Sequence, residues 1–221
     1  MNKRIEKIAS FVKKGAIVAD IGTDHAQLPI LLIENGTCER AYACDVKKGP
    51  LNSAKENIQE KHLENQIQVI LSDGFENVPE DITCAVIAGM GVLTAMHILE
   101  EAKQRLVTLD QLIVQVNDDV PLLRRYISDN HYTILDEEIV YDRGKYYTIV
   151  VFNMKNHESY TDIELIHGPI LMKKNTDLYQ EYVQKQIHHL EVIIEKAKND
   201  PKTKKEHEKE LSLWKKITIE S

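Results

Sequence analysis

The segment from Ile17 to Ala26 carries residue types that can bind a small polar ligand. An apolar run ends in Asp20, crosses Gly22 and enters the polar turn Thr23-Asp24-His25, and an apolar helical pattern begins at Leu28. A strand, turn and helix in this order place a ligand site at the carboxyl edge of a parallel sheet. The alternative is an ordinary strand-to-helix turn that binds nothing.

The residues of this turn favour a cationic or neutral ligand over a pyrophosphate. A dinucleotide-binding turn needs second and third glycines, where this sequence has Asp24 and Ala26. Because an acidic turn receives phosphate poorly, S-adenosylmethionine, which has a sulfonium there instead of phosphates, fits better than NAD. Gly22 leaves room for a ligand to approach the backbone.

Further carboxylates end or follow the predicted strands. Asp20 can accept hydrogen bonds from a ligand's amino group, or cap its own turn through backbone N–H groups. Asp45 can accept from both ribose hydroxyls of a nucleoside, and its distance along the chain from Gly22 fits a strand–helix–strand unit. Asp73 can reach an adenine amino group, with a plain Asp-Gly turn through Gly74 as the alternative.

The run Gly89-Met90-Gly91 follows the fourth predicted strand. Two glycines bring backbone close to whatever occupies the cleft, and Met90 can pack on a flat ring. The run has no Lys followed by Ser or Thr, so it is not a phosphate-binding loop of the Walker type. A tight strand-to-helix turn is the alternative reading.

The histidines do not indicate a metal site. Asp24 and His25 are adjacent, so in an extended turn their side chains need not converge on one ion. His62, His97 and His131 show no ligand spacing, and His188-His189 fits a solvated helix face. We therefore expect no bound metal.

Strand-like and helical patterns alternate along the first two thirds of the chain. Five short apolar runs predict strands, at 17–20, 41–45, 67–71, 84–88 and 112–115. Helical patterns separate them, notably from Pro50, over 93–99 and over 120–127, which indicates a parallel sheet covered on both faces. Runs at 132–140 and 146–152, joined by a turn with Arg143-Gly144, predict a closing antiparallel hairpin. This α/β architecture is expected of a class I, Rossmann-like methyltransferase.

The remaining residues predict a second, helical domain. Residues 153–159 are polar and read as a linker between a domain at 1–153 and another at 160–221. An apolar stripe close to a heptad repeat runs through Leu178, Tyr182, Ile187, Leu190, Ile194 and Ala197. Asp200-Pro201 can start another helix with a shorter stripe of Leu211, Trp214 and Ile217. The expected structure is an antiparallel helical hairpin, or coiled coil.

Composition describes a globular chain with an uneven charge distribution. The 221 residues are 43% hydrophobic and 29% charged, and the net charge of −7 falls within residues 1–153, because 154–221 is electroneutral. This acidity argues against nucleic-acid binding by bulk charge, though not against a local basic face. We expect no signal peptide or membrane span, and three cysteines without a Cys-x-x-Cys pair suggest a cytoplasmic protein.

Taken together, the motifs resemble the bacterial tRNA (adenine(22)-N1)-methyltransferase family, TrmK. The resemblance runs in order over residues 1 to about 153, and the helical hairpin is similar in kind to the family's C-terminal coiled coil. The segments that carry it are Asp20–Ala26, Leu28-Pro29, Asp45-Val46, Lys48–Pro50, Ser53-Ala54, Ala88–Gly91, Gln115–Asn117, Glu137–Ile139 and Gly144–Tyr147.

The resemblance implies S-adenosylmethionine as methyl donor and N1 of one D-loop adenosine of tRNA as acceptor. It places Asp20 and Gly22 at the methionine end, Asp45-Val46 at the ribose, and Asp73-Gly74 at the adenine. It places Gly89, Met90 and Gly91 between the two substrates. Asp24 and His25 fall where the target base arrives, which makes them the candidate catalytic residues.

Several positions depart from the family pattern. Gln27 stands where the family usually has an aromatic residue, and Val92 and Val116 stand where it has Gly and Pro. Thr23 for Ser and Asp45 for Glu are milder changes. The departures concern the acceptor side, and methylation of another RNA adenine, or a non-catalytic RNA-binding module that keeps the pocket, are the alternatives.

For the RNA partner, the candidate basic elements are Lys13-Lys14, Lys47-Lys48, Arg124-Arg125 and the lysines from Lys196 to Lys216. Each is more often a solvated face than a contact. The C-terminal set has the additional advantage of lying in an electroneutral segment. Both a monomer and a homodimer are compatible with the sequence.

Overall fold

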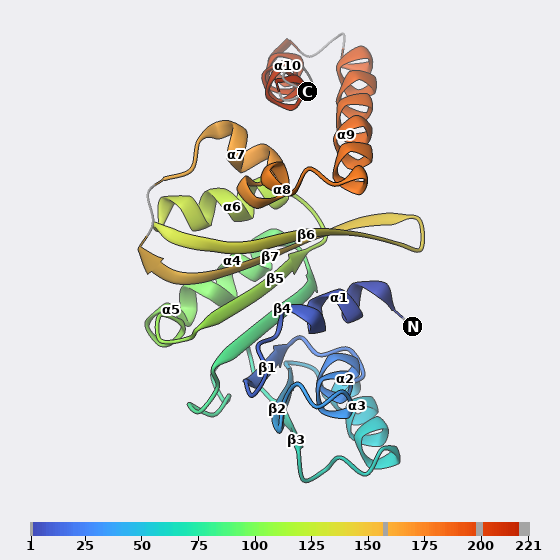
Figure 1. The fold of residues 1–221 in the computed structure, drawn as a ribbon, viewed down its shortest axis with the longest axis vertical. Coiled ribbons are helices and arrows are strands. Elements are labelled where there is room, and N and C mark those ends of the chain that lie inside the picture. The colour runs from blue at the N-terminus through green and yellow to red at the C-terminus, as the bar shows by residue number, and fades with distance from the viewer. Residues whose placement is uncertain (1, 157–158, 198–200, 217–221) are drawn as a thin grey trace.

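A single seven-stranded sheet forms the centre of the protein (Figure 1). The computed structural model describes residues 2–156, 159–197 and 201–216. The strand order is β3-β2-β1-β4-β5-β7-β6, in which β1 to β5 are parallel and β7 is antiparallel to both neighbours. The strands are β1 (Ile17–Ile21), β2 (Arg40–Asp45), β3 (Ile67–Leu71), β4 (Cys84–Met90), β5 (Gln111–Val116), β6 (Tyr132–Asp142) and β7 (Lys145–Asn156).

Helices cover both faces of this sheet, as the near-continuous apolar strands require. One face packs against α1 (Lys3–Phe11), α2 (Gln27–Glu34) and α3 (Lys48–Glu60). The other packs against α4 (Val92–Glu101), α5 (Lys103–Leu106) and α6 (Val120–Asp129). The predicted α/β sheet with a closing antiparallel hairpin is confirmed. The helices α1 and α5 have no counterpart in the sequence-based prediction.

The structure corrects the predicted linker. Strand β7 continues to Asn156, so the first four residues of the expected 153–159 linker lie in the sheet. Two short helices then follow, α7 (Asp162–His167) and α8 (Pro169–Lys174). A capping box of Thr161 and Glu164 starts α7, and the pair went unpredicted because helices of six residues have little periodicity.

The last two helices, α9 (Asp177–Lys196) and α10 (Pro201–Lys215), stand beyond the β6 edge of the sheet (Figure 1). They pack on each other and on Ile139 of β6. The buried residues of α9 are Tyr179, Val183, Ile187 and Leu190, with Trp214 buried from α10. The predicted stripe thus has the right spacing but starts one residue early, at Leu178 and Tyr182. The predicted cap Asp200 and stripe residue Ile217 lie outside the described residues.

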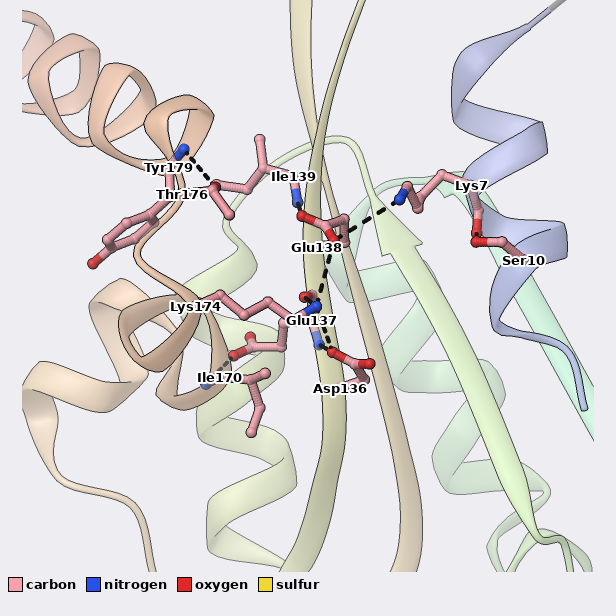
Figure 2. Close-up of polar contacts among 10 residues, drawn as sticks. All are labelled: Lys7, Ser10, Asp136, Glu137, Glu138, Ile139, Ile170, Lys174, Thr176 and Tyr179. Carbon is pink, nitrogen blue, oxygen red and sulfur yellow. Dashed lines mark hydrogen bonds and ion pairs between the residues drawn. The ribbon is translucent and has the colours of Figure 1, made fainter.

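A buried ion pair joins this helical part to the sheet. Nε of Arg124 in α6 lies 2.7 Å from Oε1 of Glu137 in β6, and both side chains are almost fully buried. Arg124 also donates to the carbonyl groups of Leu165 and Ile166 in α7. Glu137 accepts from the backbone N–H of Ile170 in α8 (Figure 2). Strand β6 therefore holds α6, α7 and α8 together through one buried charge pair.

The neighbouring acidic residues of β6 extend this contact to both sides of the strand (Figure 2). Nζ of Lys174 in α8 lies 2.7 Å from Oδ1 of Asp136 and 3.4 Å from Oε2 of Glu138. On the other side, Nζ of Lys7 in α1 lies 3.9 Å from the same Glu138 oxygen. Glu138 thus connects the first helix of the chain with the helices that follow the sheet.

Candidate active site at the carboxyl edge of the sheet

The parallel register brings the predicted site residues to one edge of the sheet. Ile21 pairs with both Cys44 and Ile87, and Asp45 pairs with Leu71. The turns that follow β1, β2, β3 and β4 therefore begin side by side. The strand ends and the turns after them contain Gly22, Asp45, Asp73 and Gly89, respectively, which is the grouping that the sequence predicted.

The turn after β1 is built on the backbone of β2. Gly22 has φ +75° and donates its N–H to the carbonyl oxygen of Cys44 at 2.8 Å, and the N–H of Thr23 donates to the same oxygen. The Thr23 hydroxyl donates to Oδ2 of Asp20 at 2.7 Å. Asp20 therefore braces its turn through a hydroxyl, and not through the backbone N–H groups expected of the capping alternative.

Asp20 is buried and carries an unusual proton affinity. Burial raises the pKa of its carboxyl group from 3.8 to about 6; the Thr23 hydroxyl opposes this shift, and repulsion from Asp24 adds to it. Arg4 and Asp45 also lie within electrostatic range. A buried carboxyl group in this state becomes more acidic when a cation arrives beside it. This property suits a ligand that carries an ammonium or sulfonium group.

Asp24 and His25 form the outer part of the same turn. His25 and Ala26 have φ values of 55° and 54°, and this left-handed stretch leads into α2. Nε2 of His25 lies 3.4 Å from Oδ1 of Asp24, so the two side chains contact each other. Both are exposed, Asp24 by 72% and His25 by 52% of the side-chain surface.

The turn after β2 is arranged for a nucleoside. Oδ1 of Asp45 accepts the N–H of Lys47 at 2.7 Å, which orients the carboxylate and leaves Oδ2 without a bond in the described contacts. Val46 exposes 57% of its surface although it is apolar. An oriented acceptor beside an uncovered apolar residue fits a ribose and the ring next to it.

Asp73 and Gly74 lie at the adjacent end of β3. Asp73 is exposed, and Gly74 has φ +49° and packs against Ile98 of α4. Both residues line a cavity of about 590 Å³, which extends to His97 and Arg105. The backbone of Asp73 and Gly74 therefore forms the turn given as the alternative. The Asp73 carboxylate is exposed and can still contact a ligand.

The segment Gly89-Met90-Gly91 closes the site on its other side. Gly89 and Met90 form the end of β4, where the pairing with β5 shifts between Ala88 and Met90, and Gly91 is the N-cap residue of α4. A Cβ atom placed on Gly22 would collide with Cε of Met90, so Met90 covers the β1 turn directly. The side-chain amide of Asn117 donates to the carbonyl oxygen of Gly89 at 2.7 Å, and the backbone N–H of Asn117 donates to the carbonyl oxygen of Met90.

Two further polar residues support this segment: Gln115, which the sequence analysis named only within a family motif, and Arg4, which it did not name. Nη1 of Arg4 in α1 donates to Oε1 of Gln115 in β5 at 2.6 Å, and the N–H of Gly89 donates to the same oxygen at 3.2 Å. The Arg4 guanidinium lies 5.4 Å from the ring centre of Tyr147. A fully buried glutamine in an apolar strand was the available signal for Gln115. Arg4 had none, because α1 was not predicted.

The candidate RNA-binding cations separate into two groups. Arg124 is buried in its pair with Glu137, so its predicted role in RNA contact is wrong. Arg125 is half exposed and lies 3.2 Å from Asp162. Lys13, Lys14, Lys47 and Lys48 are exposed, as are Lys205, Lys209, Lys215 and Lys216. The exposed group stays a prediction.

Neither a metal site nor a membrane span is found in the part of the chain that the structure describes. No three His, Cys, Asp or Glu side chains there gather closely enough to hold a metal ion. No helix among those residues is both long and apolar enough to cross a bilayer. The three cysteines, Cys38, Cys44 and Cys84, are buried free thiols.

Known proteins match this chain over most of its length. A family model described as tRNA (adenine(22)-N(1))-methyltransferase, TrmK, matches residues 18–219. The tRNA (adenine(22)-N(1))-methyltransferase of Bacillus subtilis is 31% identical over 215 residues, which cover 95% of this chain and 90% of that protein. This chain belongs to the TrmK family.

Solved structures agree in both fold and ligand. A Streptococcus agalactiae protein of the NADB-Rossmann superfamily superposes with a TM-score of 0.92 at 32% identity, covering 98% of this chain and 96% of that one. Mycoplasma capricolum TrmK, solved with S-adenosyl-homocysteine, gives 0.87 at 28% identity over 99% and 98% of the two chains. The predicted activity, S-adenosylmethionine-dependent tRNA (adenine-N1)-methyl transfer, is thereby confirmed.

Proposed function

We propose that the carboxyl edge of this sheet binds S-adenosylmethionine between the β1, β2 and β4 turns and receives N1 of adenine 22 of a tRNA at Asp24 and His25. The observation that carries this proposal is the convergence of Gly22, Asp45 and Gly89 beside an exposed Asp24–His25 pair. When bound, S-adenosylmethionine supplies a methyl group that its sulfonium makes electrophilic.

The donor side of the site fits this ligand residue by residue. Asp20 is a buried carboxyl group that gains a favourable partner when an ammonium or sulfonium approaches. Asp45 offers its free oxygen to the ribose, with Val46 beside the ring. Asp73 and Gly74 border the cavity at the end of β3, where the adenine amino group is expected.

On the acceptor side, the proposed catalysis consists of aligning the target adenine and stabilising the positive charge that forms on it. N1 of adenine carries a lone pair at neutral pH, so no residue has to remove a proton before transfer, and alignment dominates the rate. Methylation leaves a positive charge on the base, which the exposed carboxylate of Asp24 can stabilise as it develops. His25, 3.4 Å from that carboxylate, holds its orientation.

The acceptor has to reach this edge unpaired. A base-paired N1 points into the helix, so adenine 22 must be extruded from its stack or unpaired before it meets Asp24. The exposed lysines named above are the candidate phosphate contacts. The tRNA substrate and the three buried free thiols fit a protein of the reducing cytoplasm.

The test is methyl transfer to defined tRNA transcripts. The full chain is incubated with labelled S-adenosylmethionine and with two transcripts that differ only in having A or G at position 22. We expect 1-methyladenosine, identified by nucleoside mass spectrometry, in the first transcript alone. Equal methylation of both transcripts would show that the acceptor is another adenine, and methylation of neither would refute the proposed function.

A further inference from the structure

A groove lies between the acceptor side of the active site and the two long C-terminal helices. Its volume is about 520 Å³, within the range of small-molecule and nucleotide sites. One wall is the turn from Val116 to Pro121, and the opposite wall comes from α9 and α10. The hairpin residues Tyr146 and Thr148 form the floor between these walls.

The groove is continuous with the active site through one residue. Asn117 lines the groove and also donates to the carbonyl of Gly89, on the segment that covers the β1 turn. Asp118, next in the wall, accepts the N–H of Val92 at 2.7 Å through Oδ1 and so caps α4 at the same segment. A ligand chain that leaves the acceptor site past Asn117 therefore enters this groove.

The groove offers aromatic surface of the kind on which bases stack. The rings of Tyr146 and Tyr182 have centroids 5.6 Å apart, and Tyr182 lies 5.9 Å from Trp214. Tyr146 is half-buried, so part of its ring remains accessible from the groove. Base–aromatic stacking is the sequence-tolerant way in which proteins hold single-stranded nucleotides.

Charge decides which part of a nucleotide enters. The walls carry Asp118, Asp119 and Glu210, together with His189 and His207, so the interior disfavours phosphate and offers carboxylate acceptors to base N–H groups. Outside the lining residues, Nζ of Lys185 lies 4.7 Å from the Tyr146 ring centre. This arrangement suits a base inside the groove and its phosphate at the rim beside Lys185.

We propose that this groove receives the base of a nucleotide next to the target adenosine in the tRNA chain, stacked on Tyr146. The proposal rests on the proposed function, because it takes the acceptor to be an extruded tRNA nucleotide. It makes the docked C-terminal helices part of the substrate site. Recognition of one neighbour, in addition to the target base, is then a source of site specificity.

The experiment is a coupling measurement between Tyr146 and the tRNA. Transcripts with a single abasic nucleotide at each position on either side of the target are methylated by the wild-type chain and by Tyr146→Leu. Loss of one stack is expected to raise KM for intact tRNA about tenfold. At one abasic position the wild-type KM should rise equally, and Tyr146→Leu should add no further loss.

Three controls separate this result from a folding defect. Tyr146→Phe keeps the ring and should keep the coupling, whereas Leu135→Ala shortens an exposed apolar side chain of β6 that does not line the groove and should leave KM unchanged. Melting temperature and S-adenosylhomocysteine affinity should match the wild type in every variant. If Tyr146→Leu fails to fold, Gln186→Ala on α9, with a half-buried side chain that lines the groove, replaces it in the same cycle.

Two outcomes would overturn the proposal. One is an unchanged KM for intact tRNA in Tyr146→Leu, and the other is additive losses at every abasic position. A wild-type chain that methylates no transcript is a different result, because it contradicts the proposed function itself.

Discussion

Arg4 in α1 and Gln115 in β5 are joined by a 2.6 Å hydrogen bond across 111 residues of sequence. Oε1 of Gln115 also accepts the N–H of Gly89, so the first helix helps to hold the segment that we propose lies between the two substrates. The same helix is tied through Lys7 to Glu138, and thus to the β6 contacts with α8. The backbone at the end of β4 is therefore supported by the first helix, which is itself anchored on β6.

Arg4→Ala is expected to lower kcat about 30-fold, because one charged hydrogen bond of this type contributes on the order of 2 kcal/mol. The dissociation constant of S-adenosylhomocysteine should rise by less than kcat falls, because Arg4 acts on the donor side only through its electrostatic effect on Asp20. Lys3→Ala, an exposed cation in the same helix turn, is the matched control. Calorimetry and steady-state rates check this split, and equal losses of affinity and rate would argue against it.

Asp24→Asn removes the exposed carboxylate proposed to stabilise the charged product. Turnover should fall by about 100-fold, the size of effect seen when one preorganised electrostatic group is lost. Donor affinity should remain near the wild-type value. Asp110→Asn, at the opposite end of the sheet before β5, is the control for a general charge effect. A full-speed Asp24→Asn enzyme would remove this residue from the mechanism.

Gly22→Ala tests the closeness of the β1 turn to Met90. An alanine here must keep the left-handed φ of Gly22, at a cost of about 1–2 kcal/mol, and its Cβ would collide with Cε of Met90. Gly36→Ala carries the same backbone strain at φ +69° with no atom within 4 Å. We expect similar destabilisation in both variants and, for Gly22→Ala alone, at least a tenfold loss of donor affinity. Indistinguishable donor affinities would place the ligand elsewhere.

Asp20 is expected to make both stability and donor binding depend on pH. Because burial raises its pKa to about 6 in the folded protein, the native state holds a proton that the unfolded state has already released. This difference in pKa adds at most about 3 kcal/mol to the free energy of unfolding. The added stability is present near pH 4 and is lost as the pH rises to about 6. Asp20→Asn should remove this slope in urea unfolding curves, whereas an unchanged slope would contradict it.

Donor binding should show the opposite trend. A cationic ligand favours ionised Asp20, so affinity should rise between about pH 5 and 7 and binding should release a proton. Titrations in two buffers with different ionisation enthalpies measure that proton directly. Binding without proton release below pH 6 would mean that Asp20 does not face the ligand's charge.

The Arg124–Glu137 pair should dominate the attachment of the C-terminal helices. Glu137→Leu leaves a buried guanidinium unpaired and should cost about 3–5 kcal/mol, and replacing both residues with Met and Leu should cost less than either single change. Arg125→Met breaks an exposed pair with Asp162 and should cost under about 1 kcal/mol. Chemical denaturation of the three variants gives these differences. Equal costs for the buried and exposed pairs would contradict this assignment.

This pair also changes what a truncation can test. A chain that ends at Asn153 loses the end of β7 and uncovers Arg124, whose carbonyl partners lie in α7. Such a chain is expected to melt well below the full-length protein. Truncation therefore cannot report on tRNA binding alone, and point substitutions in the groove are the better probe.

The sequence predicted the features that depend on residues close together in the chain. Short apolar runs identified all seven strands, and a glycine or carboxylate at the end of a strand or just after it identified the sites at the ends of β1, β2, β3 and β4. Contacts between segments far apart in the chain could not be predicted from the sequence. Nothing in Glu137 itself marks a buried charge in the middle of a strand, and α1 is a nine-residue helix whose Arg4 gains meaning only beside Gln115.

The most direct measurement is a crystal structure of the full chain with S-adenosylhomocysteine. We predict the ribose hydroxyls on Asp45, the amino-acid end near Asp20 and Gly22, and the sulfur facing Asp24 across Met90. A nucleoside bound at another edge of the sheet, or a carboxyl edge filled by the protein's own side chains at saturating ligand, would contradict the account.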